Sequence, residues 1–384
     1  MSGSGGNLTE LKQRNRARIL RILFYDSISR AQLARRTSLT RASVSDHIDE
    51  MLAEGLVEEQ KTDGDGRRGG AVVMGINPSY GFFGGIYLNR EGCRVGLVNL
   101  KGESVAGTSS PVISDNPDET VMQMAICLQN LLVSREITPD RLLGVGVSSP
   151  GPLDTERGVI LTPPDFDIWH RYPLAEKLEE ILKTRILLEN NATSFAHIEL
   201  LSGYGRKYRD FVFLMVDSGI SGGVIIDGRL LRTRSSGTEL GHTSIAMDGR
   251  LCSCGNRGCL ERYASVPGLL LDCFSPDSGI REWRQVVDMA DRGDMRCNEV
   301  LEIEAGYLAV TLINCINTFE PEAVVLSGDL TYRPEKLLEA IDRRISKRTI
   351  MRSHRQVRVL ASEFETNDRE KAAAAAALGS FYDI

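Results

Sequence analysis

One order of strands and helices occurs twice in this chain of 384 residues, and it restricts the fold more than any other feature. Apolar stretches bounded by turn residues predict the strands of the first set, which are Phe82–Leu88, Arg94–Asn99, Glu103–Thr108 and Leu142–Val147. A helix over Pro117–Ser134 precedes the last of these strands. The second set begins with a strand over Phe211–Val216 and ends with one over Ala323–Leu326. Two such sets predict two α/β lobes around a cleft.

The first 77 residues follow a different pattern, three amphipathic helices and then a hairpin. The helices are predicted over Leu8–Tyr25, from the N-cap Ser29 to Arg36, and from the N-cap Thr40 to Glu54. Only the turn Ser38-Leu39 separates the second helix from the third. Three helices joined by such short loops are typical of a helix-turn-helix unit, in which the later helix enters the major groove of DNA.

A β-hairpin is predicted after the third helix, from strands over Leu56–Gln60 and Ala71–Met74. The loop Asp63–Gly70 between these strands is rich in glycine and carries Arg67 and Arg68. Arginine on such a loop suits insertion into a narrow, electronegative minor groove. The hairpin therefore predicts the wing of a winged helix-turn-helix domain over residues 1–77.

Charge is distributed unevenly along the chain. The whole sequence has 46 Lys and Arg against 52 Asp and Glu, a net charge of −6, which by itself argues against a nucleic-acid partner. Between Lys12 and His47, however, nine Lys or Arg stand against two Asp, a local charge of +7. This concentration favours double-stranded DNA as the partner of the N-terminal segment. The alternative, a solvated basic bundle, leaves the hairpin with its arginines unexplained.

DNA contacts are predicted at the start of the third helix and in the hairpin loop. The residues are Arg41, Ser43, Ser45, His47, Arg67 and Arg68. Asp46 lies among them, and a carboxylate at this position either points away from the phosphates or accepts a hydrogen bond from a cytosine amino group.

Three of the eight cysteines, Cys252, Cys254 and Cys259, lie close together in the sequence, and His242 precedes them. In a chain without a secretory signal, such clustering favours a metal site over disulfides. One imidazole and three thiolates are the usual ligand set of a structural, tetrahedral zinc ion. We therefore expect Zn²⁺ bound by these four residues, with free thiols beside an unrelated histidine as the alternative.

The segment that contains His242, Cys252, Cys254 and Cys259 resembles the ROK family of repressors, open reading frames and sugar kinases. Four further segments carry the same resemblance: SSPGPLD, LENNATSFA, DSGISGGVIIDG and GTELGH. The resemblance covers essentially the whole chain. It implies an α/β fold in which a winged helix-turn-helix is followed by a two-lobed, actin-like ATPase (sugar-kinase-like) domain, in a homodimer or homotetramer. The expected domains are residues 1–77, a first lobe over 78–190 and a second lobe over 191–384, whose C-terminal helix could return to the first lobe.

The resemblance also implies a sugar site in the cleft between the lobes. Carried over residue by residue, the family's sugar contacts fall on Asn190, Glu239, His242 and Glu261, with Asn191 beside them. His242 would bind zinc through one ring nitrogen and a sugar hydroxyl through the other. Carboxylates and amides suit sugar hydroxyls, which both donate and accept hydrogen bonds. Glu239 and Glu261 have an alternative role, at the surface or around the zinc ion.

The sequence departs from the kinases of this family in three places. Those kinases have an aspartate as general base where this chain has Asn191, and a neutral amide cannot take the proton from a sugar hydroxyl. Their first phosphate turn, Asp-x-Gly-x-Thr, corresponds to Tyr87–Glu91, which has neither the aspartate nor the glycine. A later glycine pair is reduced to Ser327-Gly328, whereas the turn Asp217–Gly223 is partly kept. We therefore expect no kinase activity.

A further departure lies near the sugar loop, in the segment LTPPDFDIWHRYPL. Asp165 stands where asparagine is usual in the family, so the ligand could be a different sugar, a sugar phosphate, an oligosaccharide or none. Trp169 in the same segment would either stack on a sugar face or lie in the core.

The expected function is that of a sugar-responsive, DNA-binding transcriptional regulator, a repressor of carbohydrate-metabolism genes, with its effector in the cleft. The first alternative is an active ATP-dependent sugar kinase that also binds DNA, and the second is a regulator controlled by a partner protein. No apolar run approaches the roughly 20 residues of a membrane helix, and the N-terminus lacks the apolar stretch of a signal peptide. These features predict a cytoplasmic protein without membrane contact.

Overall fold

The computed structural model describes residues 5–61, 72–90, 92–111, 116–163, 166–232, 237–350, 356–364 and 366–384. The chain divides into two compact units, one of residues 1–189 with 370–384 and one of residues 190–369. The C-terminal residues therefore belong to the first unit. Within the described ranges, no helix is long and apolar enough to cross a membrane.

The N-terminal part of the first unit is a helix-turn-helix followed by an antiparallel hairpin. Its elements are α1 (Gly5–Tyr25), α2 (Arg30–Thr37), α3 (Arg41–Ala53), β1 (Val57–Lys61) and β2 (Val72–Ile76). Ser29 caps α2 and Thr40 caps α3, each accepting a hydrogen bond from a backbone N–H of the first turn, as the sequence predicts. Ser38 adopts a φ of +58° between the two helices and so allows the tight turn. The predicted winged helix-turn-helix is confirmed.

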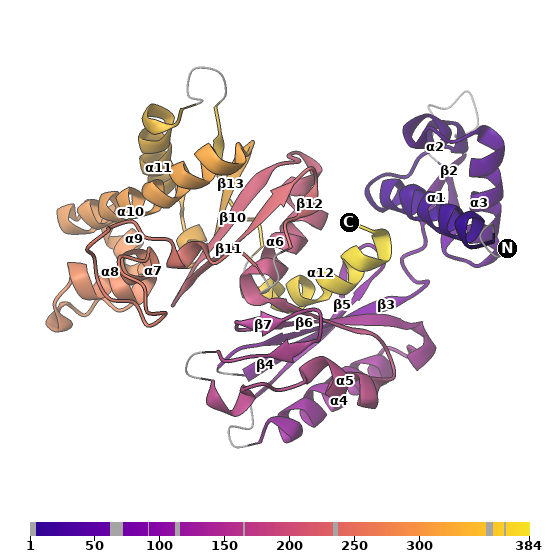
Figure 1. The fold of residues 1–384 in the computed structure, drawn as a ribbon, viewed down its shortest axis with the longest axis horizontal. Coiled ribbons are helices and arrows are strands. Elements are labelled where there is room, and N and C mark those ends of the chain that lie inside the picture. The colour runs from indigo at the N-terminus through magenta and orange to yellow at the C-terminus, as the bar shows by residue number, and fades with distance from the viewer. Residues whose placement is uncertain are drawn as a thin grey trace. The chain divides into compact units, whose positions relative to one another are not determined.

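The rest of the first unit contains a five-stranded sheet in the order β5-β4-β3-β6-β9, with helices on both faces (Figure 1). Its strands are β3 (Phe82–Leu88), β4 (Gly92–Asn99), β5 (Ser104–Pro111), β6 (Leu142–Ser149) and β9 (Ile186–Asn190), and β7 (Leu153–Asp154) pairs with β8 (Val159–Ile160). Ile86, Val95 and Val147 share one core with the apolar side chains of two helices, α4 (Pro117–Ser134) and α5 (Leu174–Leu182). Figure 1 shows α12 (Arg369–Tyr382) on the other face of the sheet.

Helix α12 packs directly on the strands because two glycines leave room for its backbone. A Cβ atom at Gly85 would lie 1.8 Å from the Glu370 carbonyl oxygen, and a Cβ atom at Gly146 would lie 1.9 Å from the Ala373 carbonyl oxygen. The alanines at positions 372 to 377 are all buried. The alanine run is therefore a packed C-terminal helix, as predicted.

The end of α12 contacts the helix-turn-helix. The Tyr382 and Phe24 rings lie 4.7 Å apart, and Arg21 forms an ion pair with Asp383 at 2.9 Å. Lys101 donates a hydrogen bond to the carbonyl oxygen of Phe24 at 3.1 Å. These contacts attach the end of α1 to the rest of the first unit. Helix α12 begins at Arg369, where the chain returns from the second unit to the first.

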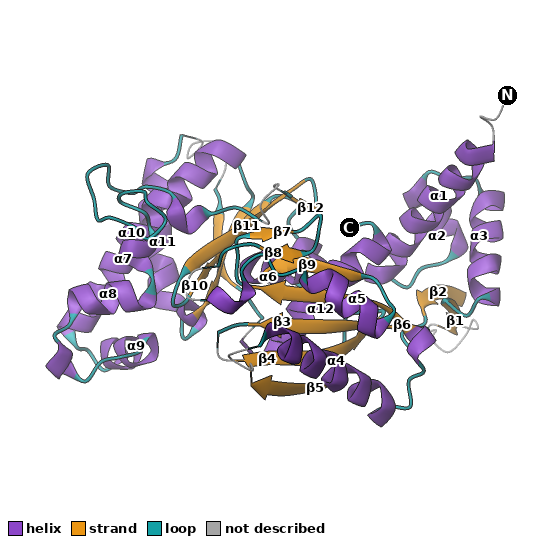
Figure 2. Ribbon diagram, turned by 60° about the horizontal axis from the view of Figure 1, so that its bottom comes forward, coloured by secondary structure: helices purple, strands orange, loops and turns teal. Residues whose placement is uncertain are grey.

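The second unit repeats the strand order of the first, with a sheet ordered β12-β11-β10-β13-β14. Its strands are β10 (Phe211–Val216), β11 (Ile220–Ile226), β12 (Arg229–Leu230), β13 (Ala323–Gly328) and β14 (Arg358–Ala361). Its helices, visible around these strands in Figure 2, are α6 (Asn191–Ser202), α7 (Glu261–Ala264), α8 (Val266–Cys273), α9 (Trp283–Asp291), α10 (Met295–Phe319) and α11 (Glu335–Arg348). In both sheets the central strand pairs antiparallel with the strand that follows it and parallel with the fourth strand of its set. The predicted pair of α/β lobes is confirmed.

Trp169 lies in the core of the first unit. Its side chain is fully buried, and its ring centroid lies 5.5 Å from that of Phe166 and 5.2 Å from that of Tyr172. Of the two alternatives for Trp169, the core position is therefore correct, and its ring is not available to stack on a sugar.

Glu304 on α10 is a carboxyl group in an apolar core. It is fully buried, and neither of its oxygens has a hydrogen-bond partner among the described residues. Burial raises the pKa of this carboxyl well above its ordinary value of 4.5. The folded protein therefore retains a proton that the unfolded chain releases above about pH 4.5, and the Glu304 contribution to stability becomes less favourable as the pH rises.

Glu304→Leu is expected to raise the free energy of unfolding at pH 7 by about 1–3 kcal/mol, because it removes a buried polar group without a partner. The gain should shrink towards pH 4, where the unfolded chain is protonated as well. Urea unfolding at both pH values measures the difference. Glu304→Gln is the matched variant, since it keeps the buried polar group but should flatten the pH dependence. A Glu304→Leu protein less stable than the wild type at pH 7 would contradict this expectation.

Candidate functional site

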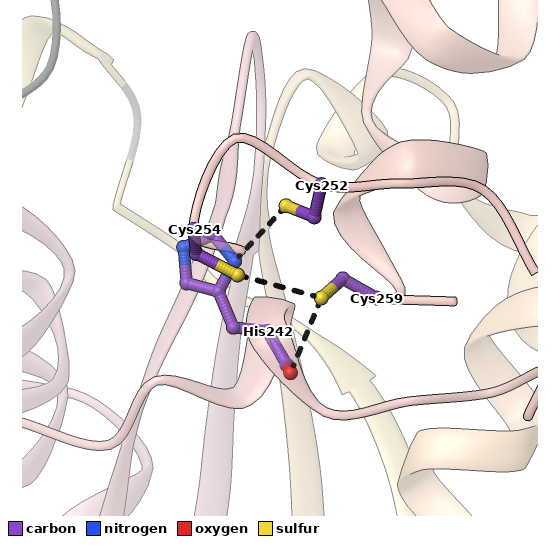
Figure 3. Close-up of side chains that lie close together, drawn as sticks. All are labelled: His242, Cys252, Cys254 and Cys259. Atoms are coloured by element: carbon purple, nitrogen blue, oxygen red, sulfur yellow. Dashed lines mark hydrogen bonds between the residues drawn. The ribbon is translucent and has the colours of Figure 1, made fainter. Parts of the chain in front are cut away.

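Four potential metal ligands come together in the chain that follows β12 (Figure 3). The ligand atoms of His242, Cys252, Cys254 and Cys259 all lie within 4.8 Å of one another. Cys254 Sγ lies 3.7 Å from Cys259 Sγ, and Cys252 Sγ lies 3.6 Å from His242 Nδ1. In a tetrahedron with metal–sulfur bonds of about 2.3 Å, two sulfurs are separated by about 3.8 Å. The four side chains therefore fit one tetrahedral metal ion, with Nδ1 as the histidine ligand.

Tight backbone turns position these ligands. His242 ends a 3₁₀ turn over Leu240–His242. Gly258 has a φ of +72° and passes so close to Ala246 that a Cβ atom would lie 1.7 Å from the Ala246 carbonyl oxygen. No other residue type fits at this position, and the close approach brings the next residue, Cys259, back towards His242.

The thiols of the cluster differ in acidity. Burial, together with the neighbouring Cys254 and Cys252 thiols, raises the pKa of Cys259 to about 12. Burial also opposes ionisation of Cys252, but hydrogen bonds from Cys254, His242 and Cys259 lower its pKa to about 7. A divalent cation would favour the thiolate form of all three.

Two of the residues that the resemblance assigns to sugar binding reach the start of β11. Glu261 Oε2 accepts a hydrogen bond from the Ile220 N–H at 2.9 Å. The Ser221 hydroxyl lies 3.5 Å from Asn190 Oδ1, which also accepts a hydrogen bond from the Ala192 N–H at 3.0 Å as the N-cap of α6. The Asn190 side-chain NH₂ has no hydrogen-bond partner among the described residues, so it is available to a ligand.

The other two predicted sugar contacts, Glu239 and His242, lie on the turn that leads into the metal cluster. The His242 backbone N–H donates to the Glu239 carbonyl oxygen at 3.0 Å. Gly241 between them approaches β11 so closely that a Cβ atom would lie 2.0 Å from the Ile220 carbonyl oxygen. The Glu239 side chain is exposed to solvent, but partial desolvation of its carboxyl raises its pKa, an effect that His242 opposes and the nearby Glu261 reinforces. The structure therefore brings Asn190, Glu239, His242 and Glu261 together in the second unit, beside the metal cluster, and Asn191 follows as the half-buried first residue of α6.

Helix α3 buries a stripe of side chains that includes one predicted DNA contact. Val44, His47, Ile48 and Met51 face the core, and His47 is only 7% exposed. Burial lowers the pKa of His47. The prediction that His47 faces DNA is therefore wrong, and the i, i+3, i+4, i+7 spacing of these four residues is the signal that could have shown it. The other predicted contacts of this helix are exposed or half-buried, namely Arg41, Ser43 and Ser45.

Most basic side chains of the helix-turn-helix form ion pairs with carboxylates. The pairs are Lys12–Glu50, Arg14–Glu10, Arg16–Glu54, Arg21–Asp383, Arg30–Asp49 and Arg36–Asp26. In the described part of the chain, Arg18, Arg35 and Arg41 are exposed and form no such pair. The local charge of +7 thus overstates the free positive charge. Arg35 in the last turn of α2 was missed by the sequence analysis, and with Arg41 it flanks the turn between α2 and α3.

The predicted wing contacts Arg67 and Arg68, like the unusual Asp165, lie outside the described residues. The strands that carry the hairpin loop are described, and β1 pairs with β2 from Val57 opposite Ile76 to Lys61 opposite Val72.

Comparison with protein families accounts for both parts of the chain. Residues 83–380 match the model of the ROK family. The chain belongs to the ROK family. Residues 13–68 match the model of the MarR family, and this range contains α2, α3 and β1 of the helix-turn-helix.

Curated relatives of this ROK protein match almost its entire length. The xylose repressor of Bacillus spizizenii is 27% identical over 380 residues, which cover 98% of each chain. The DNA-binding transcriptional repressor Mlc of Escherichia coli (strain K12) is 25% identical over 390 residues, which cover 98% of this chain and 96% of Mlc.

Solved structures show the same fold. A crystal structure of a ROK family transcriptional regulator, described as a homolog of E. coli MLC protein, has a TM-score of 0.84 and 23% identity, and the match covers 97% of both chains. The ROK hexokinase of Thermus thermophilus has a TM-score of 0.68 and 25% identity, and the match covers 78% of this chain and 99% of the hexokinase.

Proposed function

We propose that this ROK protein is a sugar-responsive transcriptional regulator that binds DNA and represses carbohydrate-metabolism genes. The proposal rests mainly on one observation. The same chain contains a helix-turn-helix with exposed arginines at its turn and a region that matches the ROK family model. Two relatives named as repressors, the xylose repressor and Mlc, each align with 98% of this chain, which supports the proposal. The fold by itself would not support a regulatory function, because ROK proteins include kinases as well.

DNA binding is assigned to the helix-turn-helix, with α3 in the major groove. Arg35 and Arg41 contact backbone phosphates on the two sides of the turn, and Ser43 and Ser45 add hydrogen bonds from α3. Arg67 and Arg68 of the wing contact the minor groove. Two copies of the chain, in a dimer or tetramer, read the two halves of a pseudo-palindromic operator.

The sugar effector is assigned to the residues around the start of β11. The Asn190 NH₂ group donates a hydrogen bond to a hydroxyl, and the Glu239 and Glu261 carboxylates accept hydrogen bonds from others. His242 Nε2 faces the sugar, while Nδ1 belongs to the metal cluster. Zn²⁺ is the ion that best suits one imidazole and three thiolates, and when bound it fixes the orientation of the imidazole ring. The metal and sugar sites are therefore coupled through one residue.

Phosphoryl transfer is not part of the proposed function. Asn191 stands at the position of the general base in the family's kinases and cannot accept the proton. At the partly kept phosphate turn, Asp217 Oδ1 accepts a hydrogen bond from the Asp329 N–H at 2.8 Å, and burial and Asp329 raise the pKa of Asp217. The proposal of a regulator rather than a kinase therefore rests on Asn191 and not on this turn.

Effector binding is expected to depend on Glu239. In a thermal-shift panel of sugars that includes xylose, glucose and N-acetylglucosamine, one sugar should raise the melting temperature of the wild type. Glu239→Gln should lower the affinity for that sugar about 10-fold to 100-fold, because a charged acceptor of hydroxyl hydrogen bonds is lost. Glu180→Gln, which changes an exposed glutamate of α5, is the matched control and should respond like the wild type.

The same sugar should release the full chain from an operator found by footprinting on duplex DNA that neighbours its gene. A chain that protects no specific site at moderate salt would contradict the proposed function. Sugar-dependent ATP turnover that Glu239→Ala abolishes would establish the kinase alternative instead. A panel in which no sugar stabilises the protein would favour control by a partner protein.

A further inference from the structure

An acidic residue lies at the centre of the exposed face of α3. Val44, His47, Ile48 and Met51 form the buried stripe of this helix. At 100° per residue, Ala42 and Asp46 lie on the opposite side, and both are exposed. They occupy the first half of α3, the part of a recognition helix whose side chains contact base edges.

Asp46 differs from the other carboxylates of α3. Asp49 pairs with Arg30 at 2.7 Å, and Glu50 pairs with Lys12 at 2.7 Å. Among the described residues, no ion pair or hydrogen bond involves the Asp46 carboxylate. A free negative charge on a DNA-facing helix that begins with Arg41 weakens attraction to phosphates, so it is unfavourable there unless DNA offers it a hydrogen-bond donor.

We propose that Asp46 is a base-reading residue, whose carboxylate accepts a hydrogen bond from the N4 amino group of a cytosine in the major groove. This inference rests on the proposed function, since it requires α3 to bind in the groove. Cytosine is favoured over adenine because the adenine amino group lies beside the N7 acceptor, which repels a carboxylate. Ala42, one helical turn earlier, is placed to contact the methyl group of a neighbouring thymine.

Selection of binding sites from a pool of random DNA duplexes tests the assignment, with the full chain as wild type, Asp46→Asn and Asp46→Ala. The wild type is expected to prefer a C·G pair at one position of each half-site by about tenfold or more. Asp46→Asn should shift that position to A·T, because an asparagine amide bonds both N6 and N7 of adenine. Asp46→Ala should leave the position without a preference. All other positions should stay as in the wild type.

Asp277→Asn is the matched control, because it makes the same charge change at an exposed residue of the second unit and should select the wild-type sequence. If both Asp46 variants select the wild-type sequence and only bind every duplex more tightly, Asp46 is merely a repulsive charge and the inference is wrong. If the wild type itself selects no sequence, the proposed function fails and the inference fails with it. The wild-type selection therefore shows whether the proposed function has failed or only the assignment of Asp46.

Discussion

Cys259→Ser is expected to remove the metal ion and a large part of the stability of the second unit. Cys259 is fully buried, and its sulfur lies 3.7 Å from that of Cys254. A serine hydroxyl stays protonated at neutral pH and does not replace a thiolate ligand. Because the ligand set exists only in the folded chain, the free energy of metal binding adds directly to that of folding. We expect a loss of about 4 kcal/mol or more, measured by denaturant unfolding and by the metal content in mass spectrometry.

Cys273→Ser is the matched control, since Cys273 is a half-buried cysteine outside the cluster. This variant should keep one equivalent of zinc and the unfolding midpoint of the wild type. The Cys259→Ser protein should also lose the sugar-dependent thermal shift, because His242 is no longer held by the metal. A wild-type protein that is equally stable with and without zinc would overturn the assignment of a structural metal.

The double variant Arg35→Ala/Arg41→Ala is expected to lose most of its affinity for DNA. Both arginines are exposed, and neither pairs with a carboxylate in the described part of the chain. Each phosphate contact contributes about 0.9 to the slope of log K against log salt. Loss of two contacts should reduce the slope by about 2 and weaken binding roughly 50-fold at about 0.1 M salt. Fluorescence anisotropy over a series of salt concentrations measures both quantities.

Lys12→Ala/Arg14→Ala removes the same charge from the same domain, but from side chains that already pair with Glu50 and Glu10. Its salt slope should change by less than about 0.5, because a neutralised cation releases few counterions from DNA. Equal losses in the two double variants would mean that net charge, and not position at the turn, determines affinity.

Local patterns in the sequence were sufficient for much of the fold. Ser29 and Thr40 were predicted as N-caps because capping depends on hydrogen bonds to residues two or three positions away. The repeated strand order was predicted from local patterns too, since most strands are short apolar stretches between turns. Strand β14 was not predicted, because it has only four residues and half-buried side chains without a clear alternation.

The candidate sites were predictable only in part. Cys252, Cys254 and Cys259 were identified by their spacing, because a metal constrains ligand type and distance along the chain. His47 was misplaced because its polarity was given more weight than its position in the buried stripe of α3. Arg35 was overlooked because all nine basic residues were treated as equally free.

The sequence by itself determined most of the secondary structure, the grouping of four potential metal ligands and the family, because each of these depends on residue types at short and fixed spacings. Only the tertiary structure decided which charged groups remain free to act. Lys12 and Glu50 are 38 positions apart, and Arg21 and Asp383 are 362 apart, yet each forms an ion pair in the folded chain. No local pattern contains such pairings, since they exist only after distant segments have packed together. The sequence named Arg41 and Asp46, but only the fold showed that they and Arg35 lack an ion-pair partner among the described residues.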